Sequence, residues 1–263
     1  MANPLTDRSS RYDARGLVEP DARAPRNARI ENGQATFDAG DLTVRETNLE
    51  LRRLIYGEGI REVVVENPGA KHSLGVGILA RCRVRFAGSL GYFGCGLIDG
   101  PEVHITGRVG WSVAENMMSG VVLIEKNAGS LAGAALRGGD LVIKGDVGAR
   151  TGIDMKGGTI LVGGNAGSMT GFMMQRGRLI ICGDVGMHLG DSMYDGAIYV
   201  GGTIASLGVD CVPAELDAAD EEMLDRKFDS YGIPRPASIR KFVCGKKLWN
   251  YDTLEPAERK LIL

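Results

Sequence analysis

A repeat of nineteen residues constrains this chain more than any other feature of its sequence. The segment from Val84 to Gly91 has a counterpart from Val103 to Gly110, and further copies follow at the same spacing. No insertion or deletion interrupts the series, so each copy is expected to form the same turn of a repetitive architecture. The copies start at Val84, Val103, Val122, Leu141, Ile160, Leu179 and, in a degraded form, Ile198.

Apolar residues occupy alternate positions at the start of each copy. Ile143 and Val162 each lie two residues after an apolar start, and both are β-branched. This period of two is typical of a β-strand with one buried face. Two more apolar columns complete the inward set, one running from Leu90 to Ile204. The other column is rich in methionine and could either pack in the core or line a ligand site. We expect core packing, because the unbranched methionine side chain fills irregular gaps. This column contains Ile98, Met117, Leu136, Met155, Met174 and Met193.

Glycine also recurs at fixed positions, and it accounts for 39 of the 263 residues. One column begins at Gly91 and another at Gly120, each repeating every nineteen residues. A glycine at the same point of every turn is what a tight corner or a close backbone approach requires. Short strands, glycine corners and a constant period together predict an all-β parallel β-helix of about seven turns, with small helical flanks.

The composition changes outside the repeats, and four segments are expected. Residues 1–40 are predicted to form an extended arm, and residues 41–80 a helix–strand cap in which Thr43 and Glu46 form a capping box. Residues 81–208 would form the β-helix, and residues 209–263 a C-terminal helix, expected near 213–230, followed by a tail that carries Trp249.

One outward column breaks the expected pattern because it is apolar on the face that should meet solvent. A continuous apolar stripe of this kind on a soluble protein is normally covered. Either the flanks of the chain or another subunit could cover it, and the sequence leaves both possibilities open. We therefore treat the stripe as a candidate partner interface, with its members Leu123, Val142, Leu161, Ile180 and Tyr199.

Little in the sequence indicates chemistry. The formal net charge of −2 gives no basis for nucleic-acid binding, and no apolar run is long enough to span a membrane. The five cysteines form no metal-binding or disulfide pattern, so reduced thiols and a cytoplasmic location are expected. No nucleophile–base pair can be assembled, and we predict no catalytic, cofactor-binding or metal-binding residue in this chain. His72 and Asn67, in the loop before the first repeat, are further candidates for partner contacts, as is Trp249.

Three sequence features together resemble a known family. They are Leu-Thr-Val-Arg-Glu-Thr-Asn at residues 42–48, Asn-Pro-Gly-Ala-Lys-His at 67–72 followed by Leu-Gly-Val-Gly at 74–77, and the nineteen-residue glycine repeats. In this order they are similar to the C-terminal GXGXG domain of glutamate synthase and to its stand-alone relatives. The resemblance covers about residues 40–208. The arm and the tail are more like the β-helical subunit of N-methylglutamate synthase.

This resemblance implies a right-handed β-helix that performs no chemistry itself. It implies a hetero-oligomer in which a class II glutamine amidotransferase subunit releases ammonia. A glutamate synthase-like subunit that binds FMN and an iron–sulfur cluster would use this ammonia, and N-methylglutamate synthase is the expected complex. The alternatives are the C subunit of a formyltransferase/hydrolase or formylmethanofuran dehydrogenase complex, or a split glutamate synthase subunit. A left-handed hexapeptide acyltransferase with His104 as base is a more distant alternative, because nineteen is not a multiple of six.

Overall fold

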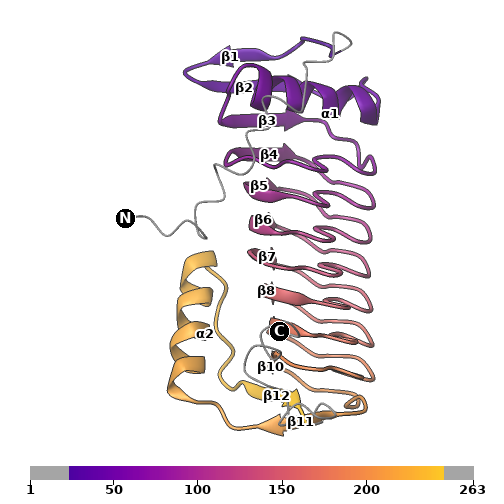
Figure 1. Cartoon of the computed structure of the whole chain (residues 1–263), viewed down its shortest axis with the longest axis vertical. Coiled ribbons are helices and arrows are strands. Elements are labelled where there is room, and N and C mark those ends of the chain that lie inside the picture. The colour runs from indigo at the N-terminus through magenta and orange to yellow at the C-terminus, as the bar shows by residue number, and fades with distance from the viewer. Residues whose placement is uncertain (1–23, 246–263) are drawn as a thin grey trace, which may run out of the picture.

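Parallel strands stacked one above another form the body of the molecule (Figure 1). The computed structural model describes residues 24–245. Nine of its strands, β2 to β10, pair in sequence order and in parallel, as expected for a β-helix. They are β2 (Gln34–Asp38), β3 (Glu62–Glu66), β4 (Arg83–Ala87), β5 (Asp99–Ile105), β6 (Ser119–Ile124), β7 (Asp140–Ile143), β8 (Lys156–Val162), β9 (Arg176–Ile181) and β10 (Ala197–Val200).

The register of these strands follows the repeat. Val122 lies opposite Leu141, and Leu141 lies opposite Ile160, so equivalent positions of successive copies stack directly. A second line of parallel bridges runs along another side of the coil, from Leu90 and Val109 to Ile204. Each turn is therefore hydrogen-bonded to both neighbours on more than one side, which makes the solenoid a continuous body.

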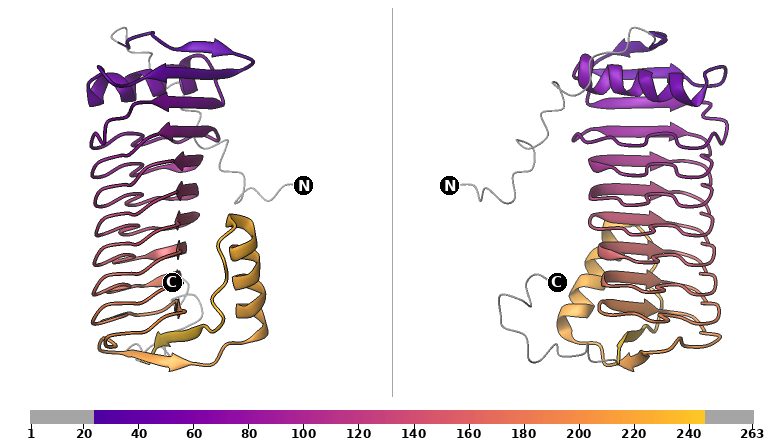
Figure 2. Two further views of the ribbon diagram at one scale, coloured as in Figure 1. Left: turned by 180° about the vertical axis from the view of Figure 1, so that it is seen from behind. Right: turned by 45° about the vertical axis from the view of Figure 1, so that its right-hand side comes forward.

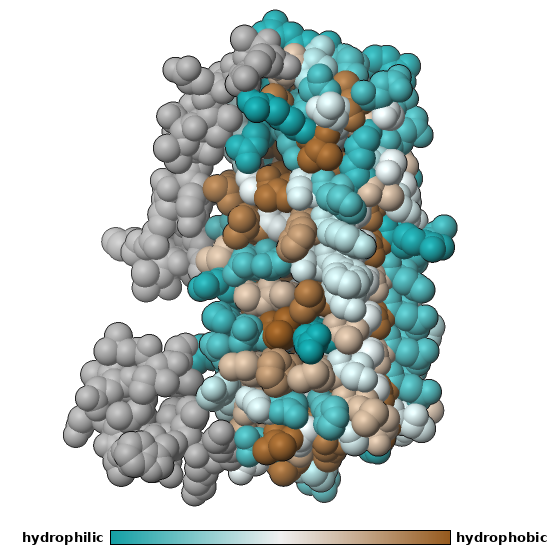
Figure 3. Space-filling view, turned by 90° about the vertical axis from the view of Figure 1, so that its right-hand side faces the viewer, coloured by the Kyte–Doolittle hydropathy of each residue, from teal (hydrophilic) through white to brown (hydrophobic). Residues whose placement is uncertain are grey.

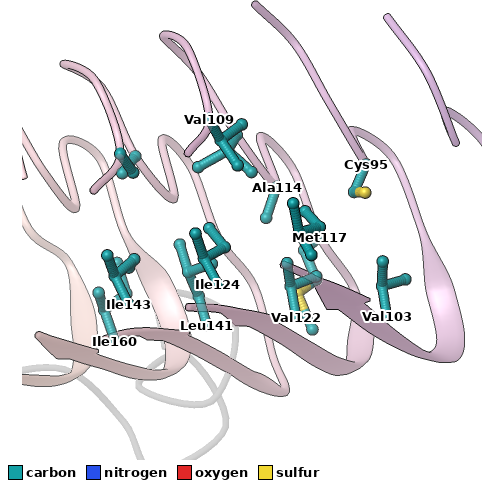
Figure 4. Close-up of a cluster of buried hydrophobic side chains, with 14 of the residues drawn as sticks. Cys95, Val103, Val109, Ala114, Met117, Val122, Ile124, Leu141, Ile143 and Ile160 are labelled. Carbon is teal, nitrogen blue, oxygen red and sulfur yellow. The ribbon is translucent and has the colours of Figure 1, made fainter. Parts of the chain in front are cut away.

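The inward columns form one apolar core along the length of the coil. Ile143 and Val162 have no exposed surface. The methionine column is equally buried, which confirms its role in packing: Met117, Met155, Met174 and Met193 are all inaccessible. Figure 4 shows residues of three inward columns, including Val109, Met117 and Ile143, pointing into the same interior.

An N-terminal cap closes one end of the solenoid. Helix α1 (Val44–Arg52) begins at the predicted capping box of Thr43 and Glu46 and continues into a π-helical turn, Arg53–Gly57. Strand β1 (Arg29–Glu31) pairs antiparallel with β2, and β2 pairs in parallel with β3. This differs from the extended arm expected over residues 1–40, since residues 34–38 extend the same sheet as the repeats. Strand β2 lies outside the nineteen-residue repeat, so the spacing that identified the strands of the repeats could not identify it.

A C-terminal unit closes the other end and also folds back along the solenoid. Strand β12 (Arg240–Cys244) pairs antiparallel with β10 and with β11 (Cys211–Ala214). Between β11 and β12, helix α2 (Ala218–Tyr231) lies beside the lower turns, as Figure 1 and both views of Figure 2 show. The helix begins later than predicted because Pro213 belongs to β11 and Asp217 caps the helix.

The glycine columns serve two different purposes. Gly139 and its equivalents have a positive φ, 79° at Gly139 itself, which only glycine adopts without strain. Gly110 instead permits close approach, because an added Cβ would lie 2.5 Å from a ring carbon of Tyr92 and 2.7 Å from the carbonyl carbon of Gly91. Both requirements recur once per turn, which explains the repeated glycines.

Candidate functional site

The outward apolar stripe is covered by the chain itself. Val142, Leu161, Ile180 and Tyr199 are each at most 1% exposed. They pack against three apolar residues of α2, Met223, Leu224 and Phe228, and against Ile233, two residues after the helix. The four residues are therefore unavailable to a partner, which corrects their assignment as a candidate interface. Leu123, the fifth member, is only half-buried at the margin of this cluster.

Two groups of polar contacts fix α2 on the stripe. Near its C-terminal end, Lys227 Nζ lies 2.6 Å from Oδ2 of Asp140 on β7, and the Tyr231 hydroxyl donates to the same oxygen. Near its N-terminal end, the Tyr199 hydroxyl donates to Oδ1 of Asp220 at 2.6 Å, and Lys241 binds Oδ2. These contacts set the position of the helix, which apolar packing alone would leave free to slide.

The pKa of the Asp220 carboxyl reflects its partners. Burial raises this pKa, but the hydrogen bonds from Lys241 and Tyr199 outweigh burial and hold it below its ordinary value of 3.8. Burial and the Asp220 carboxylate together raise the pKa of the Tyr199 phenol, which therefore remains a donor at neutral pH. A charged carboxylate, hydrogen-bonded by Tyr199 and Lys241, therefore holds the helix to the sheet at neutral pH.

Above the end of α2, the same outward face is open. A groove of about 560 Å³ lies over β3 to β6, with Leu123, Arg85 and Tyr231 among its lining residues. His104 on its floor contacts Glu125, with Nε2 2.8 Å from Oε1, and Lys144 contacts the other oxygen of Glu125. A half-exposed histidine held in this way is part of a surface ion-pair network, and it lacks the open position expected of the acyltransferase base considered above.

A ladder of stacked aromatic rings marks a different side of the solenoid. The rings of His72 and Tyr92 stack with centroids 4.6 Å apart, and those of Tyr92 and Trp111 follow at 5.5 Å. We call these three residues the aromatic ladder. Trp111 keeps 53% of its surface exposed and Tyr92 keeps 44%. Large aromatic surface left in solvent is typical of a protein-binding site.

The ladder is held rigidly by the backbone. The N–H of Tyr92 donates to Nδ1 of His72 at 2.9 Å, so Nδ1 accepts and the proton of a neutral ring lies on Nε2. The loop that carries His72 is itself paired with the first repeat, because Ser73 N–H donates to the carbonyl of Tyr92 at 2.7 Å. The rings therefore occupy preset positions, which lowers the entropy lost on binding.

One aromatic and one aliphatic side chain, both in the first repeat, add to the exposed apolar surface. Phe93 and Leu97, in the first repeat, are 49% and 57% exposed. Both have positive φ, near 58°, but so do the equivalent positions in later turns, such as Leu131 and Ala135. The left-handed backbone is thus a property of every turn. Large apolar side chains recur at some of the equivalent positions, such as Leu131, but only those of the first turn are exposed. Figure 3 shows the side of the solenoid formed by the connecting loops, where apolar groups recur among polar ones.

The other predicted interface residues have different outcomes. Asn67 lies at the surface, but its amide donates to Oδ2 of Asp38 at 2.9 Å, which ties the loop to the cap. Trp249 lies outside the described residues 24–245. Among the predicted site residues within 24–245, His72 is the one that the structure brings into the exposed aromatic group.

Tyr92 and Trp111 were missed by sequence reasoning, although a signal existed. They are nineteen residues apart, and each directly follows a glycine of the column that begins at Gly91. His72 precedes Tyr92 by twenty residues, so it does not belong to the repeat and could not be aligned with it.

Within residues 24–245, no cluster of His, Cys, Asp or Glu side chains has the geometry of a metal site. In the same part of the chain, no helix combines the length and apolarity needed to cross a bilayer.

Known proteins resemble the chain in sequence over part of its length and in fold over most of it. No protein-family profile matches it. Over 88 residues it is 40% identical to Protein GlxC of Rhizobium meliloti (strain 1021). That match spans 34% of this chain and 39% of GlxC, so the chain is aligned with about two fifths of that relative.

A solved structure resembles about two thirds of this chain in fold. It is a chain of the formyltransferase/hydrolase complex (FhcABCD) from Methylorubrum extorquens in complex with methylofuran, with a TM-score of 0.58 and 26% identity. The similarity covers 65% of this chain and 67% of that one. A β-helix of this kind is therefore found as one component of a multi-subunit enzyme.

Proposed function

We propose that this chain is a non-catalytic scaffold subunit of a glutamate synthase-like complex. The observation that carries the proposal is the exposed aromatic ladder on a solenoid whose other apolar face is already covered by α2. A rigid body with one preset aromatic surface is suited to hold partner subunits in a fixed relation. The sequence similarity to GlxC and the presence of a similar β-helix in an enzyme complex support this assignment.

The finer assignment rests on two resemblances in the sequence. The motifs at residues 42–48 and 67–77 are similar to the glutamate synthase GXGXG domain and its stand-alone relatives, and the sequences of the 1–40 arm and the tail are more like the β-helical subunit of N-methylglutamate synthase. The proposed partners are therefore a glutaminase subunit and a subunit that binds FMN and an iron–sulfur cluster. In that complex, methylamine and glutamate would form N-methylglutamate with ammonia as the leaving group, and ammonia would pass between the glutaminase and FMN subunits. The role proposed for this chain is to space the two catalytic subunits.

A second candidate function has its own support. The structural likeness is to a chain of a formyltransferase/hydrolase complex, so a subunit of such a complex is the competing assignment. The two proposals share a scaffold role and differ in the partners.

Co-purification of the native complex, with mass-spectrometric identification of its subunits, tests both. Recovery of a glutaminase and a flavoprotein supports the first assignment, and recovery of formyltransferase and hydrolase subunits supports the second. A chain that purifies alone under gentle conditions would contradict both.

A pair of variants tests the proposed contact surface. Trp111→Ala removes half-exposed aromatic surface and should abolish recovery of at least one partner while leaving the melting temperature of the isolated chain within about 2 °C. Val209→Ala, at a side chain that is 68% exposed on the opposite end, should leave recovery unchanged. Full recovery of the complex by Trp111→Ala would remove the ladder from the interface.

A further inference from the structure

Two cysteines lie directly opposite each other in the C-terminal unit. Cys211 on β11 and Cys244 on β12 are register partners in an antiparallel pair. Directly opposite residues of an antiparallel pair project to the same face of the sheet. Both side chains lie on the core side of their strands: Cys211 is 5% exposed, and Cys244 is half-buried against the same cluster.

The hydrogen-bond pattern brings these two residues especially close. Gly245 N–H donates to the carbonyl of Asp210 at 2.7 Å, so Asp210 and Gly245 form a hydrogen-bonded pair. Pairs alternate along an antiparallel ladder, which makes Cys211 and Cys244 a non-hydrogen-bonded pair. In such pairs the Cα atoms are about 4.5 Å apart. Disulfides need about 4.4–6.8 Å between Cα atoms, so a bridge fits with little movement of either strand.

Both sulfur atoms lie beside the same turn of the solenoid. Cys244 Sγ donates to the carbonyl of Met193 at 3.0 Å. Cys211 Sγ lies so close to Gly190 that a Cβ added there would be 2.8 Å away. Gly190 and Met193 are the two ends of one tight turn, since Met193 N–H donates to the carbonyl of Gly190. The two thiols thus share one small site.

We propose that Cys211 and Cys244 form an intramolecular disulfide that covalently closes the segment carrying α2. The oxidant is a low-molecular-weight disulfide such as oxidised glutathione. Cys244, the more exposed thiol, loses its proton and attacks one oxidant sulfur, forming a mixed disulfide and releasing one small thiol. Cys211 then loses its proton and attacks Sγ of Cys244, and the second small thiol leaves. Two protein thiols are oxidised by two electrons and one small disulfide is reduced to two thiols.

The bridge would hold in place the segment that covers the outward stripe. The segment between the two cysteines contains all of α2, which covers Val142, Leu161 and Ile180. Closing it into a loop restricts the conformations open to this segment when it detaches, which favours the attached state. Burial raises the pKa of the Cys211 thiol to about 11, so the closing step is expected to accelerate as the pH rises toward that value.

Oxidation of the full chain with oxidised glutathione, followed by mass spectrometry of the non-reduced digest, tests the proposal. The expected result is a peptide pair joined through Cys211 and Cys244, with loss of two hydrogen atoms from the intact chain. Amide exchange in α2 should slow at least about tenfold on oxidation, and a reductant should restore it.

Serine variants provide the controls. Cys211→Ser should stop at a glutathione adduct on Cys244, because the second thiol is missing. Cys182→Ser removes a cysteine elsewhere on the solenoid and should leave the bridge unchanged. The proposal is overturned if the wild-type chain accumulates only the adduct on Cys244, or if its bridge involves a different pair of cysteines.

Discussion

The ammonium group of Lys227 lies 2.6 Å from the carboxylate of Asp140, although 87 residues separate them in the sequence. Asp140 is on β7, and Lys227 is on α2. This contact places the end of the helix at the middle of the solenoid. The turns before β7, from β3 to β6, keep an open outward face, and α2 covers the turns from β7 to β10.

Leu161→Asp should destabilise the isolated chain. Leu161 is 1% exposed beneath α2, so a carboxylate there would be buried without a partner or would displace the helix. We expect the melting temperature measured by circular dichroism to fall by more than about 5 °C. Val209→Asp, at an exposed position, is the control and should change it by less than about 2 °C. An unchanged melting temperature for Leu161→Asp would show that α2 does not cover the stripe in solution.

Ile143→Ala should lower the free energy of unfolding by about 2–5 kcal/mol. The side chain is fully buried in the inward column, and its neighbours in the turns above and below are held by the register and can collapse only partly. Chemical denaturation measures the change. Met187→Ala, at a side chain 53% exposed, should cost no more than about 0.5 kcal/mol. Equal effects of the two substitutions would place Ile143 outside the core.

Gly110→Ala should be destabilising, and Gly96→Ala should be close to neutral. An added Cβ at Gly110 meets the Tyr92 ring at 2.5 Å and the carbonyl carbon of Gly91 at 2.7 Å, and the backbone there cannot yield without breaking the stacking of turns. At Gly96 the nearest atom is an ordinary 3.6 Å away. Neither glycine has a positive φ, so the comparison isolates the steric effect. Thermal unfolding of both variants measures it, and a stable Gly110→Ala chain would argue against the close approach.

Asp220 should contribute stability at neutral pH that disappears in acid. Its pKa in the folded state lies below the ordinary 3.8, because Lys241 and Tyr199 bind the charged form. A carboxyl whose pKa is lower in the folded than in the unfolded state stabilises the fold fully at a pH above its unfolded pKa. This stabilisation is lost as the pH falls through the folded-state pKa. The difference in stability between wild type and Asp220→Asn should therefore be present at pH 7 and shrink below about pH 4. Asp229→Asn, on the exposed side of α2, is the matched control. A difference that persists at low pH would contradict the assignment.

The repeat made most of the fold predictable from the sequence. Positions nineteen residues apart must be equivalent when no insertion intervenes, so Ile143, Val162 and Met155 could be assigned to the core without coordinates. The capping box of Thr43 and Glu46 was predictable for the same kind of reason, because it depends only on residues three apart. The sequence also predicted that the stripe at Leu161 needs a cover, since its apolar character is visible in every turn.

Tertiary structure alone decided what provides that cover. Whether α2 or another subunit packs on Leu161 depends on how the chain returns after β11, and no periodicity links Lys227 to Asp140 or Asp220 to Tyr199. The aromatic ladder was hidden because His72 enters from a loop outside the repeat, and the facing of Cys211 and Cys244 depends on an antiparallel register between strands separated by a helix. Local and periodic interactions are encoded in spacing along the chain, whereas contacts between the repeat and its flanks are selected only when the folded surfaces meet.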